Sequence, residues 1–197
     1  MRGVSRETSE RLAAYQALVK KWNPRINLIA RSTLDQIYDR HIRDSAQLVD
    51  MVGLNSGAWA DIGSGGGFPG LVAAILRANQ PISFSLIESD QRKATFLRAC
   101  ARELALPNVQ VHAARIEALK PAAADIVSAR ALAPLPDLMS YVHRHMKPDG
   151  AAWLLKGESW QSEVQDAKVD WRFDFDAHPS QTHDGAAILR ITNLSHV

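Results

Sequence analysis

Hydrophobic residues recur at helical spacing near the start of the 197-residue chain. Residues 5–22 place apolar side chains three or four positions apart, which predicts an amphipathic helix that Pro24 ends. A second helix is expected from Thr33 to Gly53, because Thr33 and Gln36 have the spacing of a capping box and glycine suits a helix end. About 55 mostly helical residues therefore precede the first expected strand. The buried face of the first helix would consist of Leu12, Tyr15, Leu18, Val19 and Trp22.

Beyond residue 55, short strand-like runs alternate with helical segments. This alternation predicts a twisted, mostly parallel sheet with helices on both faces. Two strands close together at the end of the chain predict an antiparallel hairpin. We therefore expect an N-terminal helical extension (residues 1–55) and an α/β domain (residues 56–197) with a seven-stranded, Rossmann-like sheet. The expected strands cover 58–60, 82–88, 109–112, 125–128, 151–156, 171–175 and 187–191.

A glycine-rich turn over residues 61–70 connects the first expected strand to a helix. Glycines at 63, 65, 67 and 70 allow positive φ angles and let a ligand approach the backbone closely. Such a turn presents free amides and the positive end of a helix to an anionic or polar ligand. The next strand ends at Glu88, where an acidic residue can hold ribose hydroxyls. Gly65 and Glu88 are therefore expected to bind a nucleoside-containing cofactor.

Two cofactors fit this turn. The spacing from Gly65 to Gly70 matches the dinucleotide fingerprint, which would make the protein a nicotinamide-dependent oxidoreductase. The alternating glycines after Asp61 instead resemble the first motif of S-adenosylmethionine-dependent methyltransferases. The helical extension disfavours the oxidoreductase, as does a chain too short for a second nucleotide-binding half. A tight turn without a ligand is the remaining interpretation.

Composition and charge narrow the possible partners. The one cysteine, Cys100, cannot form an intrachain disulfide, and no apolar run approaches the length of a membrane span. We therefore expect a cytoplasmic protein without membrane contact. The segment from Lys20 to Arg43 is rich in basic residues, which suits contact with RNA or a solvated helical surface equally well. Its charged residues are Lys20, Lys21, Arg25, Arg31, Arg40 and Arg43 against Asp35 and Asp39.

Several further motifs, taken together, resemble one family, the bacterial small-subunit rRNA guanine-N7 methyltransferases, also known as glucose-inhibited division protein B. The resemblance runs from residue 22 to 157, and it implies a class I methyltransferase fold with S-adenosylmethionine as the cofactor. It also implies methylation of N7 of one guanosine in 16S rRNA, as naked RNA or as a small ribosomal subunit particle. The matching segments cover residues 22–28, 40–45, 61–70, 86–89, 93–97, 115–117, 128–131 and 155–157.

The resemblance also assigns site residues. The positions that would contact S-adenosylmethionine are Gly63, Phe68, Ile116, Glu117 and Arg130. Separately from the resemblance, the residues expected at the RNA are Asn27 and His41, with Arg115 and Lys156 at the carboxyl ends of expected strands. Each has a structural alternative: His41 could join the helical extension to the sheet through Asp44, Asn27 could hold a loop, and Arg115 and Lys156 could form surface ion pairs.

The chemistry of the acceptor limits the groups that the protein must supply. Guanine N7 carries a free lone pair and loses no proton on methylation, so no catalytic acid or base is expected, and no metal. Methyltransferases of exocyclic amines usually carry an Asn/Asp-Pro-Pro-aromatic motif, whereas this chain has Ala133-Pro134-Leu135-Pro136. A pyrimidine carbon would need a cysteine nucleophile, and Cys100 lies mid-helix among apolar residues. Methylation of another RNA or of a small molecule, and a non-catalytic RNA-binding module, remain alternatives; we expect a monomer.

Overall fold

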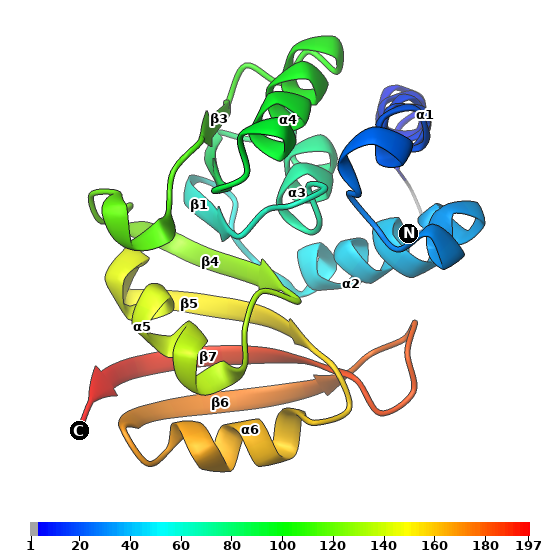
Figure 1. The fold of residues 1–197 in the computed structure, drawn as a ribbon. Helices are drawn as coiled ribbons and strands as arrows, with labels where there is room; N and C mark the ends of the chain where they lie inside the picture. The colour runs from blue at the N-terminus through cyan, green and yellow to red at the C-terminus, as the bar shows by residue number, and fades with distance from the viewer. Residues whose placement is uncertain (1–3) are drawn as a thin grey trace.

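Seven strands form one sheet in the order β3-β2-β1-β4-β5-β7-β6 (Figure 1). The computed structural model describes residues 4–197. The first five strands are parallel, whereas β7 is antiparallel to both β5 and β6. The predicted seven-stranded, mostly parallel sheet with its antiparallel C-terminal hairpin is confirmed. The strands are β1 (Gly57–Ile62), β2 (Ile82–Ile87), β3 (Val109–His112), β4 (Ala124–Arg130), β5 (Met146–Lys156), β6 (Trp171–Pro179) and β7 (Ala187–His196).

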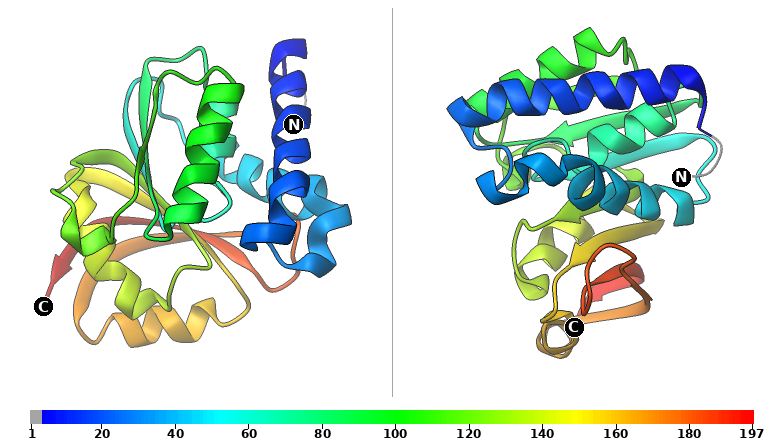
Figure 2. Two further views of the ribbon diagram at one scale, coloured as in Figure 1. Left: turned by 45° about the horizontal axis from the view of Figure 1, so that its top comes forward. Right: turned by 90° about the vertical axis from the view of Figure 1, so that its right-hand side faces the viewer.

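Helices cover both faces of the sheet (Figures 1 and 2). One layer consists of α1 (Arg6–Ile26), α2 (Arg43–Met51), α3 (Gly70–Leu76) and α4 (Gln91–Glu103). The other consists of α5 (Leu135–His145) and α6 (Trp160–Ala167). Shorter helical segments are η1 (Arg31–Gln36), η2 (Tyr38–Ile42) and η3 (Ile116–Ala118).

Strand β1 shows how the sequence pattern produces these two layers. Successive side chains of a strand point to opposite faces, so Trp59 packs with the α1–α4 layer and Ala60 and Ile62 pack with α5. All three are at most 1% exposed, as expected for a central parallel strand covered on both sides. The N-terminal helices share one hydrophobic cluster with the sheet, through Leu12, Tyr15 and Val49 among others. The division at residue 55 stays a prediction.

The first helix continues past the proline that was expected to end it. Helix α1 includes Pro24 and ends at Ile26, where Asn27 adopts a left-handed conformation with φ 51°. Pro24 lies near the end of the helix, so it removes only one backbone hydrogen bond, on an exposed face. The buried Asn23 side chain then accepts hydrogen bonds from Leu28 N (2.8 Å) and Ile29 N (2.9 Å) and fixes the chain after the helix.

The prediction of one continuous second helix is wrong for the first half of that segment. Segment 31–51 consists of η1, a π-helical η2 and α2, and Thr33 does not form a capping box. Its hydroxyl donates to Ala30 O instead (2.8 Å), and His41 approaches it from η2. A π-helical turn inserts an extra residue relative to an α-helix and so changes which side chains face the sheet. Within residues 4–197, no helix combines the length and hydrophobicity needed to cross a bilayer.

Candidate active site

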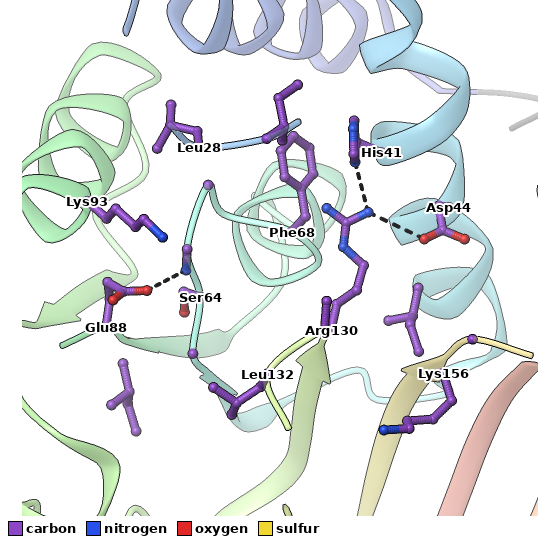
Figure 3. Close-up of a pocket in the computed structure, with 18 of the residues that line it drawn as sticks. Leu28, His41, Asp44, Ser64, Phe68, Glu88, Lys93, Arg130, Leu132 and Lys156 are labelled. Atoms are coloured by element: carbon purple, nitrogen blue, oxygen red, sulfur yellow. Dashed lines mark hydrogen bonds and ion pairs between the residues drawn. The ribbon is translucent and has the colours of Figure 1, made fainter. Parts of the chain in front are cut away.

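A cleft of about 770 Å³ opens at the carboxyl ends of the parallel strands (Figure 3). Its walls are the glycine-rich turn after β1, the ends of β2, β4 and β5, and the helical segments η1 and η2. The loop between β6 and β7 also contributes. Ligands of open α/β sheets bind at this edge, and the volume is in the range of small-molecule sites.

The glycine-rich turn has one packed side and one open side. Gly63, Gly65 and Gly67 all have positive φ angles (67°, 54° and 92°), which side chains rarely adopt. A Cβ on Gly67 would lie 2.8 Å from Tyr15 Oη and 2.9 Å from Leu71 Cβ. A Cβ on Gly65 would meet nothing closer than Gly63 O at 3.7 Å. The turn is therefore packed against the protein at Gly67 and leaves space for a ligand at Gly65.

Glu88 connects this turn to the end of β2. This residue is 7% exposed, and its Oε2 accepts a hydrogen bond from Gly65 N (2.8 Å). Oε1 accepts another from Asp90 N (2.7 Å). Each carboxylate oxygen has a second lone pair, so both can still accept hydroxyl groups from the cleft. The sequence-predicted pair, Gly65 and Glu88, therefore lies together on one wall.

Beneath the turn, a buried hydrogen-bonded chain holds Asp61. Trp59 Nε1 donates to Ser128 Oγ (2.8 Å), and Ser128 Oγ donates to Asp61 Oδ1 (2.6 Å). Burial raises the pKa of Asp61 to about 6 despite hydrogen bonds that lower it. The Asp61 side chain also explains the glycine at position 70, where a Cβ would lie 2.5 Å from Asp61 Cβ and 2.6 Å from its carboxyl carbon.

The opposite wall carries a mostly buried cation. The guanidinium of Arg130, at the end of β4, lies 4.9 Å from the centre of the Phe68 ring (Figure 3). Its Nη1 donates to His41 Nδ1 (2.9 Å) and is 3.5 Å from Asp44 Oδ2. Among the described residues, Nε and Nη2 have no hydrogen-bond partner. Because burying a charge costs free energy unless it is paired, the remaining N–H groups favour an anionic ligand group in the cleft.

His41 is held as a neutral imidazole. Arginine can only donate, so Nδ1 is the acceptor and the proton resides on Nε2, which donates to Thr33 Oγ1 (2.8 Å). Burial lowers the pKa of His41 from 6.5 to about 4, with the nearby Arg130 and Arg40 charges as further causes. Both ring nitrogens are engaged, so this imidazole has no lone pair available for a substrate proton.

Of the residues predicted to contact the adenosine or the RNA, some line the cleft and others lie on the exposed surface. Ile116 is buried at the cleft, and the exposed Glu117 pairs with the exposed Arg115 at 3.1 Å. Lys156 lines the cleft but is occupied: it donates to Ala133 O (3.0 Å) and pairs with Glu163 (2.5 Å). Asn27 is exposed on the α1 end and does not line the cleft. Their predicted roles stay predictions.

Cys100 lies away from the cleft on α4 and is fully buried. Burial raises the pKa of its thiol well above the usual range, which keeps it protonated and unreactive. No cluster of His, Cys, Asp and Glu side chains in residues 4–197 is arranged to hold a metal ion.

Sequence reasoning did not identify the cleft residues contributed by the β6–β7 loop, Ser180 and His183, nor Leu132, Lys93 and Tyr141. A signal for the loop was present. Strand β7 runs antiparallel to β5 and begins opposite its end, where Ala187 pairs with Lys156. The turn of the predicted hairpin must therefore lie at the carboxyl edge of the sheet, beside the cleft.

Comparisons with known proteins identify the family of the chain. A family model described as rRNA small subunit methyltransferase G matches residues 8–187. Ribosomal RNA small subunit methyltransferase G of Paracoccus denitrificans is 58% identical over 193 residues, 98% of each chain. The protein of the same name from Granulibacter bethesdensis is 45% identical over 195 residues, 99% of this chain and 90% of that one.

Two of the solved structures that resemble this one have low sequence identity and show the fold alone. A TehB-like SAM-dependent methyltransferase from Corynebacterium glutamicum has a TM-score of 0.62 at 15% identity and covers 92% of this chain and 98% of its own. M. jannaschii TYW2 in complex with AdoMet has a TM-score of 0.58 at 12% identity, covering 80% and 76%. On the family model and the high-identity relatives, the chain belongs to the rRNA small subunit methyltransferase G family.

Proposed function

We propose that the protein transfers a methyl group from S-adenosylmethionine to N7 of a guanine in 16S rRNA. Family membership makes it an enzyme that methylates small-subunit rRNA with S-adenosylmethionine as the donor. The specific acceptor atom and the residues that serve it are our proposal. The observation that carries it is the engaged, neutral His41 between Arg130 and Thr33.

The cofactor fits the residues of the cleft. The open side of Gly65 accommodates a ligand in contact with the backbone, and a side chain there would fill that space. Glu88 would accept the ribose hydroxyls, and Ile116 supplies an apolar surface for the adenine. The free N–H groups of Arg130 would hold the carboxylate of the amino-acid part, with Phe68 keeping the guanidinium in place.

S-adenosylmethionine supplies an electrophilic methyl group on a positively charged sulfur. The protein then has to align the acceptor with this methyl group and exclude water, since an in-line displacement at N7 releases no proton. His41 is unsuited to act as a base because Arg130 occupies Nδ1 and Thr33 receives the Nε2 proton. The segment after β4, residues 131–134, carries no Asn or Asp to orient an amino group. These features support a ring nitrogen with a free lone pair as the acceptor.

Basic side chains around the cleft support a polyanionic substrate. Lys93 and Arg40 line it directly, and Arg31 and Arg25 are exposed nearby on the helical extension. Cations placed around a concave site raise the local concentration of a phosphate backbone and position it without reading its sequence.

The test is methylation of small-subunit rRNA by the purified protein. N7-methylguanine makes its nucleotide labile, so reduction and aniline treatment should cut the RNA strand at the modified position. Cys100→Ala should retain full activity, because the thiol is buried and protonated. Methylated RNA that resists scission, or activity that requires Cys100, would contradict N7 as the acceptor. Parallel assays on naked rRNA and on small-subunit particles would identify the form of the substrate.

A further inference from the structure

The loop between β6 and β7 makes specific side-chain contacts with the wall of the cleft. This loop covers residues 180–186 and lies at the carboxyl edge because β7 is antiparallel to β5. Its Thr182 Oγ1 donates to Asp44 Oδ1 (2.7 Å), although the two residues are 138 positions apart in the chain. The loop thus reaches α2, which belongs to the N-terminal extension.

A second residue of α2 fastens the same loop. The side chain of Gln47 is 6% exposed, and its Oε1 accepts a hydrogen bond from Gln181 N (2.8 Å). Its Nε2 donates to Asp44 Oδ1 (2.8 Å) and to Ser180 Oγ (3.2 Å). Gln47 therefore connects the loop backbone to the Asp44 carboxylate.

These contacts use one oxygen of Asp44 and leave the other for Arg130. Oδ1 accepts both the Thr182 hydroxyl and the Gln47 amide, whereas Oδ2 faces Arg130 Nη1 at 3.5 Å. Two donors on one oxygen fix the rotation of a carboxylate that could otherwise turn about its Cβ–Cγ bond. Arg130 is long and flexible, so the direction of its free N–H groups depends on such neighbours.

We propose that Thr182 is a positioning residue that acts through Asp44 to hold Arg130 in the orientation that binds S-adenosylmethionine. The inference rests on the proposed role of Arg130 toward the cofactor. It gives the C-terminal hairpin a part in cofactor binding, although the motifs that carry the family resemblance all lie before residue 158. The loop would fix Asp44 and Arg130 on the wall of the cleft that lies opposite the glycine-rich turn.

The first experiment measures equilibrium binding of S-adenosylmethionine to Thr182→Val, which removes the hydroxyl and changes no charge. We expect affinity to fall about fivefold, the effect of losing one hydrogen bond in a network. Thr182→Ser should restore it. Thr192→Val in β7 is the matched control, since the Thr192 side chain makes no hydrogen bond in residues 4–197 and should leave affinity unchanged.

The second experiment is a double-mutant cycle with Asp44→Ala. If Thr182 acts through Asp44, Thr182→Val should have no further effect on cofactor affinity in that background. Equal effects in both backgrounds would overturn the proposal. So would a Thr182→Val protein whose cofactor affinity is unchanged while its rRNA affinity falls, because the loop would then contact RNA directly.

A readout on the protein without ligand separates positioning from general destabilisation. NMR titration of the His41 ring reports the neighbouring guanidinium, which contributes to its low pKa. In Thr182→Val, displacement of Arg130 should raise the pKa of His41, whereas a merely less stable fold should leave it unchanged below the melting temperature.

If wild-type protein fails to bind S-adenosylmethionine, the proposed function fails. If wild-type protein binds it and Thr182→Val behaves like wild type, only this inference fails.

Discussion

The two walls of the cleft are built in different ways. The wall that we call the turn wall consists of residues 63–70 and Glu88. Its shape follows from the backbone of the glycine-rich turn, and the Glu88 carboxylate accepts a hydrogen bond from Gly65 N. The wall that we call the side-chain wall consists of His41, Asp44 and Arg130, which come from η2, α2 and β4. The loop carrying Thr182 supports it.

The difference shows how local and distant sequence contribute to one site. The turn wall depends on φ angles that glycine adopts easily, and the hydrogen bond that joins its two parts, from Gly65 N to Glu88 Oε2, spans only 23 positions along the chain. The side-chain wall depends on a mostly buried charge whose partners are 86 and 89 positions away. A backbone site tolerates few substitutions, whereas a side-chain site can be adjusted through its supporting residues.

The largest effect is expected from Gly67→Ala, which tests the packed side of the turn wall. The new Cβ would overlap Tyr15 Oη and Leu71 Cβ, at a φ of 92° that alanine rarely adopts. We expect the free energy of unfolding to fall by about 3 kcal/mol. Denaturant unfolding measures it. Gly53→Ala, where a Cβ meets nothing within 4 Å, is the control. Equal stability of both variants would show that the turn is not packed as described.

Gly65→Val tests the open side of the same turn. A valine there fills space that belongs to the cleft, so the protein should no longer bind S-adenosylmethionine. Isothermal titration calorimetry measures this binding. Stability should fall by only about 1–2 kcal/mol, since the strain of a positive φ is the main cost. Undiminished cofactor binding would remove the turn wall from the cofactor site.

A smaller effect is expected from the basic surface around the side-chain wall. Replacing the exposed Arg25, Arg31 and Arg43 by glutamine should weaken rRNA binding and flatten its dependence on salt. Removing one phosphate contact reduces the log–log slope by roughly 0.7–0.9. Filter binding over a range of salt concentrations measures the slope. An unchanged slope would mean that these arginines are only a solvated surface. The matched control is Arg190→Gln on β7.

The smallest effect concerns the pH dependence of stability through His41. Its pKa is about 4 in the folded protein and 6.5 in the unfolded chain, so between these values the unfolded chain binds the extra proton. Its contribution to stability should therefore be present above pH 6.5 and decline as the pH falls toward 4. Groups that face it are Arg130 and Arg40, with Asp44 beyond Arg130.

Asp61 changes the pH dependence of stability in the opposite direction to His41. Its pKa is raised from 3.8 to about 6, so the folded protein binds the extra proton between these values and gains stability as the pH falls. The His41 contribution is therefore read from the stability of wild type relative to His41→Asn, which should decrease as the pH is lowered from 7 to 5. A difference that stays constant over this range would contradict the neutral imidazole.

Sequence reasoning recovered the parts of the molecule that local patterns encode. The family, the class I sheet with its terminal hairpin, the enzyme class and the cofactor are confirmed. The boundary at Pro24 was wrong because a proline near the end of a helix removes only one hydrogen bond. The capping box at Thr33 was wrong because that hydroxyl bonds to Ala30 O and His41.

Other site properties depend on contacts between distant segments. The predicted RNA residue Lys156 donates to Ala133 O, 23 positions away, and pairs with Glu163 on α6, and only the fold brings these three residues together. The exposed Arg115–Glu117 pair, by contrast, is a local contact between residues two positions apart. Thr182 likewise depends on a distant contact, because its partner Asp44 lies on α2, 138 positions earlier in the chain.

Local sequence is enough to specify the alternation of strands and helices, the glycine-rich turn and the acid at the end of β2. These features follow from hydrophobic periodicity and from backbone conformations that only certain residues adopt. Tertiary contacts are needed to place Arg130 between His41 and Asp44, and to bring a C-terminal loop onto Asp44. The orientation of a charged side chain depends on which partners the fold brings within hydrogen-bonding distance, and those partners lie far away in the sequence.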